Sequence, residues 1–181
     1  MCPRRFRPVD LTSLHNDADV MRWINGGEAT PLSVARDTTL PTFMRTPAPS
    51  RGYWLAEYPH GSFAGWFSLR QETDGASLGY RLAQAAWGQG LGTEGAQALL
   101  GIAFNTPDLN RVSTTTYEKN TGSQRVLDKL GFKPVRRFRL TVDVIEASET
   151  APTTSAEVWD GDELEYVLER RTWARDVANG I

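Results

Sequence analysis

Cysteine is almost absent from this chain of 181 residues, because Cys2 is the only one. A single cysteine excludes an intrachain disulfide and a cysteine-based zinc site. No apolar run approaches the roughly 20 residues that a membrane-spanning helix needs. The basic start of the chain is not followed by the apolar stretch of a signal peptide. We therefore expect a cytoplasmic protein that makes no membrane contact and holds no metal.

A strong net charge is absent as well. Lys and Arg number 20 against 22 Asp and Glu, a formal net charge of −2. The chain therefore lacks the overall positive charge that would indicate a nucleic-acid partner. The apolar fraction of 40% and the charged fraction of 23% are typical of globular proteins. The length suits one domain, residues 1–181, with a sizeable core.

The spacing of apolar residues predicts an α/β domain with a mixed sheet. Strands are expected over residues 6–9, 53–58, 62–69, 76–83, 111–117, 134–143 and 164–171. Helices are expected over residues 11–21, after a glycine-rich turn near residue 90, and up to residue 130. Residues 25–49 should hold a second short helix and a mobile loop. The acidic connection 145–163 is long for a hairpin loop, which is typical of a functional or disordered segment.

Glycines crowd the junction between the expected strand 76–83 and the next helix: Gly88, Gly90, Gly92 and Gly95. Glycine lets the backbone adopt positive φ and approach a ligand closely. The N-terminus of the following helix offers free N–H groups and the positive end of the helix dipole. This combination predicts a phosphate-binding turn.

Two other interpretations of the turn are open. Residues 90–95 match the Rossmann dinucleotide fingerprint in letters, with Glu118 available as the ribose-binding acid. That fingerprint should begin at the end of the strand, yet residues 83–89 intervene, and too little chain follows for a doubly wound sheet. A plain turn that needs glycine for packing would leave the motif around residue 120 unexplained.

Both segments together resemble a known family. Residues 87–96, WGQGLGTEGA, resemble the acetyl-CoA pyrophosphate motif of the GNAT superfamily. Residues 78–82, LGYRL, resemble its RimJ/RimL-like branch of ribosomal-protein N-terminal acetyltransferases. Residues 118–132 resemble the second cofactor motif, and residues 166–170 the last strand. The resemblance covers nearly the whole chain and implies a mixed sheet that is splayed between two strands, with helices on both faces.

The resemblance implies acetyl-CoA as co-substrate. Backbone groups of Leu82 and Ala83 would pair with the pantetheine arm, and Asn120 and Ser123 would contact the pantetheine and the region near the thiol. The pyrophosphate would be held by backbone N–H groups of the glycine turn, those of Gln89, Gly90, Leu91, Gly92 and Thr93.

The chain departs from the family pattern at two positions. Leu127 stands seven residues after Asn120, where many members carry a tyrosine general acid. Ser123 is therefore the candidate for protonating or holding the CoA thiolate. The usual alanine of the glycine helix is Gly95, which weakens that helix by up to ~1 kcal/mol.

Carboxylates and histidines offer few candidates for a general base. Glu118 ends a central strand near the expected opening of the sheet, and it is the candidate catalytic carboxylate. Capping, surface or packing roles are expected for the remaining groups: Glu57, Glu94, His15 and His60.

In this mechanism a neutral amine attacks the thioester directly, with both reactants positioned by the protein. Deprotonating a lysine-like amine at pH 7 costs about 4–5 kcal/mol, but an α-amino group costs only about 1 kcal/mol. The expected acceptor is a primary amine, either a protein N-terminus or a small molecule. An aminoglycoside-type enzyme and a catalytically silent acetyl-CoA-binding module are the alternatives. A homodimer is compatible with the sequence.

Overall fold

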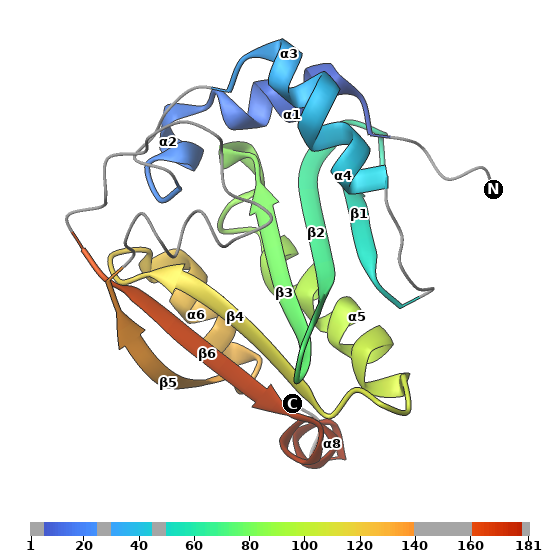
Figure 1. Ribbon diagram of the computed structural model, residues 1–181, viewed down its shortest axis with the longest axis vertical. Coiled ribbons are helices and arrows are strands. Elements are labelled where there is room, and N and C mark those ends of the chain that lie inside the picture. Colours follow the sequence, from blue (N-terminus) through green and yellow to red (C-terminus); the bar gives the residue numbers. More distant parts are fainter. Residues whose placement is uncertain (1–5, 25–29, 45–49, 140–160, 179–181) are drawn as a thin grey trace.

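One mixed sheet organises the chain, whose computed structural model describes residues 6–24, 30–44, 50–139 and 161–178. The sheet has six strands in the order β1-β2-β3-β4-β6-β5 (Figure 1). Their bounds are β1 Gly52–Glu57, β2 Phe63–Glu72, β3 Gly75–Leu82, β4 Arg111–Tyr117, β5 Lys133–Phe138 and β6 Glu163–Glu169. Only β3 and β4 pair in parallel. The strands expected from residue 53 onward are confirmed, with shifted ends, but residues 140–143 of the expected strand 134–143 lie outside the described residues.

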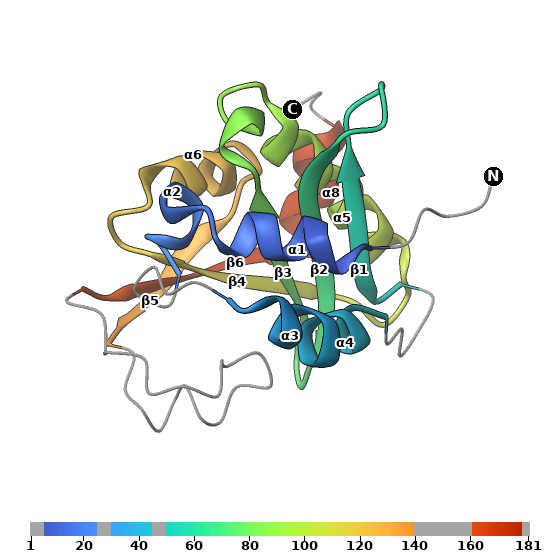
Figure 2. The same cartoon turned by 90° about the horizontal axis from the view of Figure 1, so that it is seen from above.

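Helices cover both faces of this sheet, as expected. Their bounds are α1 Pro8–His15, α2 Ala18–Met21, α3 Leu32–Val34, the π-helix η2 Ala35–Thr39, α4 Leu40–Met44, the 3-10 turn η3 Gln84–Ala86, α5 Leu91–Asn105, α6 Thr121–Lys129 and α8 Arg170–Ala178. Seen from above, α3 and α4 lie on one face of the sheet, and α5 and α6 lie on the other (Figure 2).

The strand expected over residues 6–9 is wrong, because Pro8 begins α1 instead. Proline suits the first helical position, since its fixed φ matches the helix and it has no N–H to leave unpaired. Arg7 and Asp10 form an ion pair across the first turn, with 2.7 Å between Nη2 and Oδ1. Leu11 and Leu14 on the same helix are buried. Burial of this apolar face favours the helix over an edge strand.

The rest of the N-terminal region is also more helical than expected. The helix expected over residues 11–21 is split, because Asp17 caps a separate α2 by accepting from the N–H groups of Asp19 and Val20. In place of one short helix, residues 32–44 form α3, η2 and α4 in succession. Residues 25–29 and 45–49 of the expected loop, and residues 145–160 of the acidic connection, lie outside the described residues.

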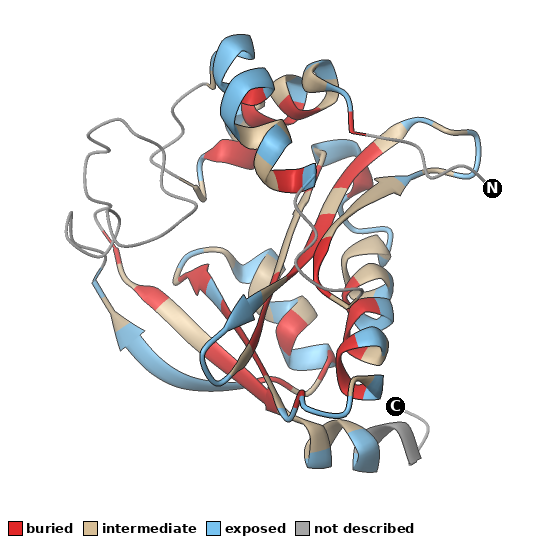
Figure 3. Cartoon of the chain, turned by 45° about the vertical axis from the view of Figure 1, so that its right-hand side comes forward, coloured by how far each residue is buried: buried red, intermediate tan, exposed pale blue. Residues whose placement is uncertain are grey.

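Two hydrophobic cores hold the helices on the sheet. The apolar residues that recur at helical spacing along α5 are all buried: Ala96, Leu99, Leu100 and Ala103. On the other face, Phe43 of α4 stacks on Tyr53 at 3.9 Å between ring centroids and meets Trp66 edge-on at 5.1 Å. These hairpin aromatics therefore belong to the second core. Figure 3 shows the buried residues where α5 packs on the sheet, whereas β5 stays exposed at its edge.

The sheet is splayed between its two parallel strands. The pairing of β3 with β4 extends over Ala76–Val112 and Ser77–Ser113 and goes no further. Beyond these pairs the strands diverge toward Leu82 and the end of β4 (Figure 1). The expected opening is confirmed, and it leaves the far end of β3 without a neighbour on that side.

Candidate functional site

A cavity of about 520 Å³ lies where the two strands diverge. It is bounded by the end of β3, the glycine-rich turn, the first turns of α5 and α6, and the residues around the end of α2. The structure brings these predicted cofactor residues together around it: Leu82, Gly90, Gly92, Thr93, Asn120 and Ser123. Ala83, Gln89 and Leu91 are neighbours in sequence, but they do not line the cavity.

The glycine-rich turn needs its glycines for backbone conformation. Gly88 and Gly90 have φ of 71° and 83°, and a Cβ added to either would meet nothing within 4 Å. Positive φ, and not crowding, is therefore what favours glycine here. Gly90 is the N-cap of α5, and its carbonyl accepts the N–H groups of Thr93 and Glu94, each at 3.0 Å. The N–H that we predicted for pyrophosphate at Thr93 is thus already bonded.

The N–H groups before Thr93 are differently placed. Within the described part of the chain, those of residues 88 to 92 donate to no backbone acceptor. They stand at the N-terminus of a 15-residue helix, whose dipole adds a positive potential. Consecutive free N–H groups at a helix start form an anion-binding site.

The exposed edge of β3 supplies the second part of the site. The N–H of Ala83 donates to the carbonyl of Ala64 on β2 at 2.9 Å. Because backbone groups alternate between the two neighbours of a strand, those of Leu82 and Tyr80 point toward β4, beyond the end of the ladder. The carbonyl of Leu82 accepts the indole N–H of Trp87 at 2.9 Å. The N–H of Leu82 therefore faces the side of the predicted pairing, while the Leu82 carbonyl and the Ala83 N–H are already bonded.

The start of α6 positions the predicted serine. The side chain of Asn120 caps this helix by accepting the N–H of Ser123 at 3.1 Å. The Ser123 hydroxyl lies 2.9 Å from the hydroxyl of Tyr80, a residue of β3. Burial raises the pKa of Tyr80 to about 12, and the hydrogen bond with Ser123 opposes that rise. Sequence reasoning missed Tyr80, because nothing in its spacing indicates a partner 43 residues away.

The charge of the cavity wall is positive. Arg22, Arg125 and Lys129 line it, together with Arg81, whose pKa burial lowers to about 10. No Asp, Glu or His is found among its described lining residues. Such a wall suits a polyanionic ligand. Arg125 and Lys129 are one helical turn apart on α6, a spacing that could have indicated a shared face.

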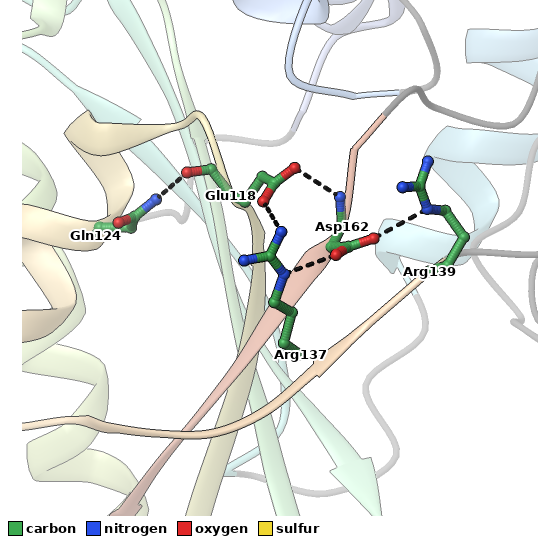
Figure 4. Close-up of polar contacts among 5 residues, drawn as sticks. All are labelled: Glu118, Gln124, Arg137, Arg139 and Asp162. Carbon is green, nitrogen blue, oxygen red and sulfur yellow. Dashed lines mark hydrogen bonds and ion pairs between the residues drawn. The ribbon is translucent and has the colours of Figure 1, made fainter.

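Glu118 lies apart from this cavity and is held in a network of charges (Figure 4). One carboxylate oxygen pairs with Arg137 at 2.6 Å, and the other accepts the N–H of Asp162 at 3.1 Å. Arg137 and Arg139 also bind the carboxylate of Asp162, at 2.6 and 2.9 Å. The network ties the end of β4 to β5 and β6. The structure therefore does not bring the predicted catalytic carboxylate together with Ser123.

The histidines have the roles expected of them. His15 is buried in α1, and burial, with a smaller effect of the Arg81 charge, lowers its pKa to about 3. His60 lies exposed on a turn and stacks on Tyr58. In the residues described, no group of His, Cys, Asp and Glu could hold a metal ion. The described helices also include none that is long and apolar enough to cross a membrane.

Comparison with known proteins places these features in a family. The model of the acetyltransferase (GNAT) domain matches residues 2–133, which is most of the chain. The chain belongs to the GNAT acetyltransferase family.

Three relatives of this GNAT domain illustrate its range. FsC-acetyl coenzyme A-N(2)-transacetylase of Aspergillus fumigatus is 28% identical over 72% of the chain and 55% of its own length. YdaF of Bacillus subtilis (strain 168), provisionally named a ribosomal N-acetyltransferase, is 31% identical over 54% of the chain and 55% of its own length. The chain thus spans about half the length of each. The crystal structure of aminoglycoside acetyltransferase AAC(6')-Ib with coenzyme A shares the fold, with a TM-score of 0.67, 20% identity and coverage of 95% and 96%.

The two departures from the GNAT pattern have physical explanations. Leu127 is fully buried in the core, so its position offers no group to the cavity. A Cβ on Gly95 would overlap the ring of Phe67, because α5 packs tightly on β2 at this point. Glycine at position 95 is therefore required by packing, despite its poor helix propensity.

Proposed function

We propose that this GNAT domain binds acetyl-CoA in the cavity at the splayed sheet and transfers the acetyl group to a primary amine by direct attack. The free N–H groups of residues 88 to 92 hold the pyrophosphate. The edge of β3 at Leu82 pairs with the pantetheine, and Asn120 and Ser123 lie near the thioester. The observation that carries the proposal is the convergence of these three elements on one basic cavity.

The composition of the cavity wall favours an α-amine as the acceptor. Its described residues include no Asp, Glu or His, and both carboxylate oxygens of Glu118 are engaged elsewhere. An α-amino group needs only about 1 kcal/mol for deprotonation near pH 7, so it reacts without a strong base, whereas a lysine-like amine does not. We therefore propose a protein N-terminus as the acceptor, in line with the RimJ/RimL-like motifs at residues 78–96.

A small-molecule amine is the second candidate, because structural likeness to an aminoglycoside acetyltransferase supports it. On that alternative Glu118 would serve as the base once released from Arg137. The proposed role of Ser123, close to the thiol, argues against a catalytically silent module. A screen of peptides and small amines with acetyl-CoA, followed by thiol release, separates the three. Binding of acetyl-CoA without turnover of any amine would favour the silent module.

The cofactor site has a sharper test in a matched pair of variants. Gln89→Glu adds a negative charge beside the free N–H groups, and Gln97→Glu adds the same charge to an exposed position of α5. A carboxylate ~6 Å from a doubly charged pyrophosphate costs about 1.4 kcal/mol in water, which is about tenfold in affinity. We expect the KM for acetyl-CoA to rise about tenfold in Gln89→Glu and to stay unchanged in Gln97→Glu. Equal KM values for the two variants would contradict the proposed pyrophosphate site.

A further inference from the structure

The hydroxyl pair between β3 and α6 joins two segments that both resemble the family, residues 78–82 and 118–132, but the resemblance assigned no role to Tyr80. Many GNAT enzymes carry a tyrosine acid where this chain has Leu127, which is buried and offers no polar group. Tyr80 brings a tyrosine hydroxyl to the same cavity from another element, and it meets Ser123 at 2.9 Å. The lost hydroxyl is thus matched by one that the sequence pattern does not indicate.

Both members of the pair are held in place by other contacts. The ring of Tyr80 packs against Phe67, with 5.8 Å between ring centroids, and borders the main core. Ser123 is fixed through its N–H, which Asn120 accepts as the cap of α6. Two rigid elements therefore determine the position of each oxygen, which is the condition for a preorganised donor.

Counting protons shows what the pair can donate. Each hydroxyl carries one proton, and one of the two is used between the oxygens. Either hydroxyl can donate across the 2.9 Å contact, but a phenol is the stronger acid, which favours the arrangement in which Tyr80 donates to Ser123 and leaves the serine proton free for a third group. Cooperative polarisation strengthens that remaining bond.

The ionisation of Tyr80 distinguishes a hydrogen-bond donor from a proton donor. Burial raises the pKa of Tyr80 to about 12, whereas a thiol ionises near about 8.5. Complete transfer of the tyrosine proton to a thiolate would be unfavourable by roughly three orders of magnitude. Tyr80 therefore stays protonated while a thiolate forms beside the pair.

We propose that Tyr80 is a positioning residue that polarises Ser123, so that the serine hydroxyl donates a hydrogen bond to the sulfur of the departing CoA thiolate. This inference rests on the proposed acetyl transfer. As the amine nitrogen bonds to the acetyl carbon, the C–S bond breaks and its electron pair stays on sulfur. The extra proton of the acylated nitrogen passes to water, and the thiolate later takes a proton from water.

The test uses CoA itself, so it needs no identified amine. The ultraviolet absorbance of the thiolate is titrated with pH in the complex of the full-length protein with CoA. A hydrogen bond donated to a charged group shifts such an equilibrium by about 10- to 100-fold. We expect bound CoA to ionise at lower pH than free CoA, by one to two pKa units on this scale. Ser123→Ala should remove most but not all of the difference, because the basic residues of the cavity wall also favour the thiolate. Tyr80→Phe should remove at least half of it, and Ser123→Thr, which keeps a hydroxyl, should retain most of it.

Two controls separate this role from a structural one. Tyr58→Phe removes a tyrosine hydroxyl outside the cavity and should leave the titration unchanged. Desulfo-CoA, which lacks the sulfur, should bind Tyr80→Phe as tightly as the wild type.

The possible results divide clearly. An unshifted thiol in the wild-type complex, or a Tyr80→Phe complex that titrates like the wild type, would overturn the inference. The inference is also overturned if the effects of Tyr80→Phe and Ser123→Ala on the pKa of the bound thiol are additive. If Tyr80 acts only through Ser123, the double variant should show the same thiol pKa as Ser123→Ala alone. If the wild type fails to bind CoA at all, the proposed function falls and the inference falls with it.

Discussion

Glu163, at the start of β6, makes the stability of this protein depend on pH. Its side chain is 8% exposed, and it lies opposite Tyr117 and Phe138 in the register of the sheet. Burial raises the pKa of this carboxyl from 4.5 to about 7. Among the described residues, the nearby Arg137 is committed to Glu118 and Asp162. The folded protein thus favours the neutral form of Glu163.

The sign of the effect follows from linkage. Because the folded pKa lies above the unfolded one, the folded state binds the proton more tightly between pH 4.5 and about pH 7. The free energy of unfolding is therefore undiminished below pH 4.5 and falls as pH rises through about 7. At 1.36 kcal/mol per pKa unit, the loss by pH 8 is about 3 kcal/mol.

Replacing Glu163 by Gln removes this loss. Denaturant unfolding at about pH 5 and about pH 8 should show the wild type losing about 2–3 kcal/mol relative to Glu163→Gln between the two conditions. Glu165→Gln is the matched control on the same strand, because Glu165 is partly exposed and pairs with Arg111 at 3.5 Å. That change should cost less than about 1 kcal/mol at either pH. If Glu163→Gln and the wild type change in parallel between the two pH values, the reasoning is refuted.

Two further predictions concern packing and a buried histidine. Gly95→Ala should destabilise the protein by about 1–3 kcal/mol in denaturant unfolding, because the added methyl overlaps Phe67, although helix propensity alone predicts a gain. Gly101→Ala, on the same helix with open space around it, should stabilise by up to about 1 kcal/mol, and equal responses of the two variants would contradict this account. The pKa of His15 falls from 6.5 to about 3, so its contribution to stability is present above pH 6.5 and is lost as pH falls. Relative to His15→Phe, the free energy of unfolding of the wild type should fall by about 3 kcal/mol between neutral pH and pH 4. If thermal melts over this pH range show a constant difference between the two proteins, a buried neutral imidazole is ruled out.

The strands and the glycine-rich turn before α5 could be predicted from local pattern because the signal is local. Alternation over residues 53–83 and the spacing of Ala96, Leu99, Leu100 and Ala103 report directly which side faces the core. The prediction for the N-terminal region failed because the deciding contacts there are not local. Of the strand-like residues 6–9, Pro8 and Val9 begin a helix, because burial of Leu11 and Leu14 outweighs weak local preference.

The candidate site divides in the same way. The glycines at 88 and 90 need positive φ, which is a property of the residue, so the turn is visible in the sequence. The contacts of the Glu118 carboxylate are not visible in the sequence, because its partners Arg137 and Asp162 come from β5 and from the residue before β6. A carboxylate at a strand end has the same appearance in sequence whether it is free or held in an ion pair.

The sequence by itself determined the class of fold, the position of the glycine-rich turn and the family to which the chain belongs. These depend on residue type and spacing within one segment. Only the tertiary structure decided that the N–H groups of residues 88 to 92 are free while that of Thr93 is bonded, that Gly95 is needed beneath Phe67, and that Tyr80 meets Ser123. Each of these depends on a geometric relation that arises when the chain folds, and two of them join residues distant in sequence.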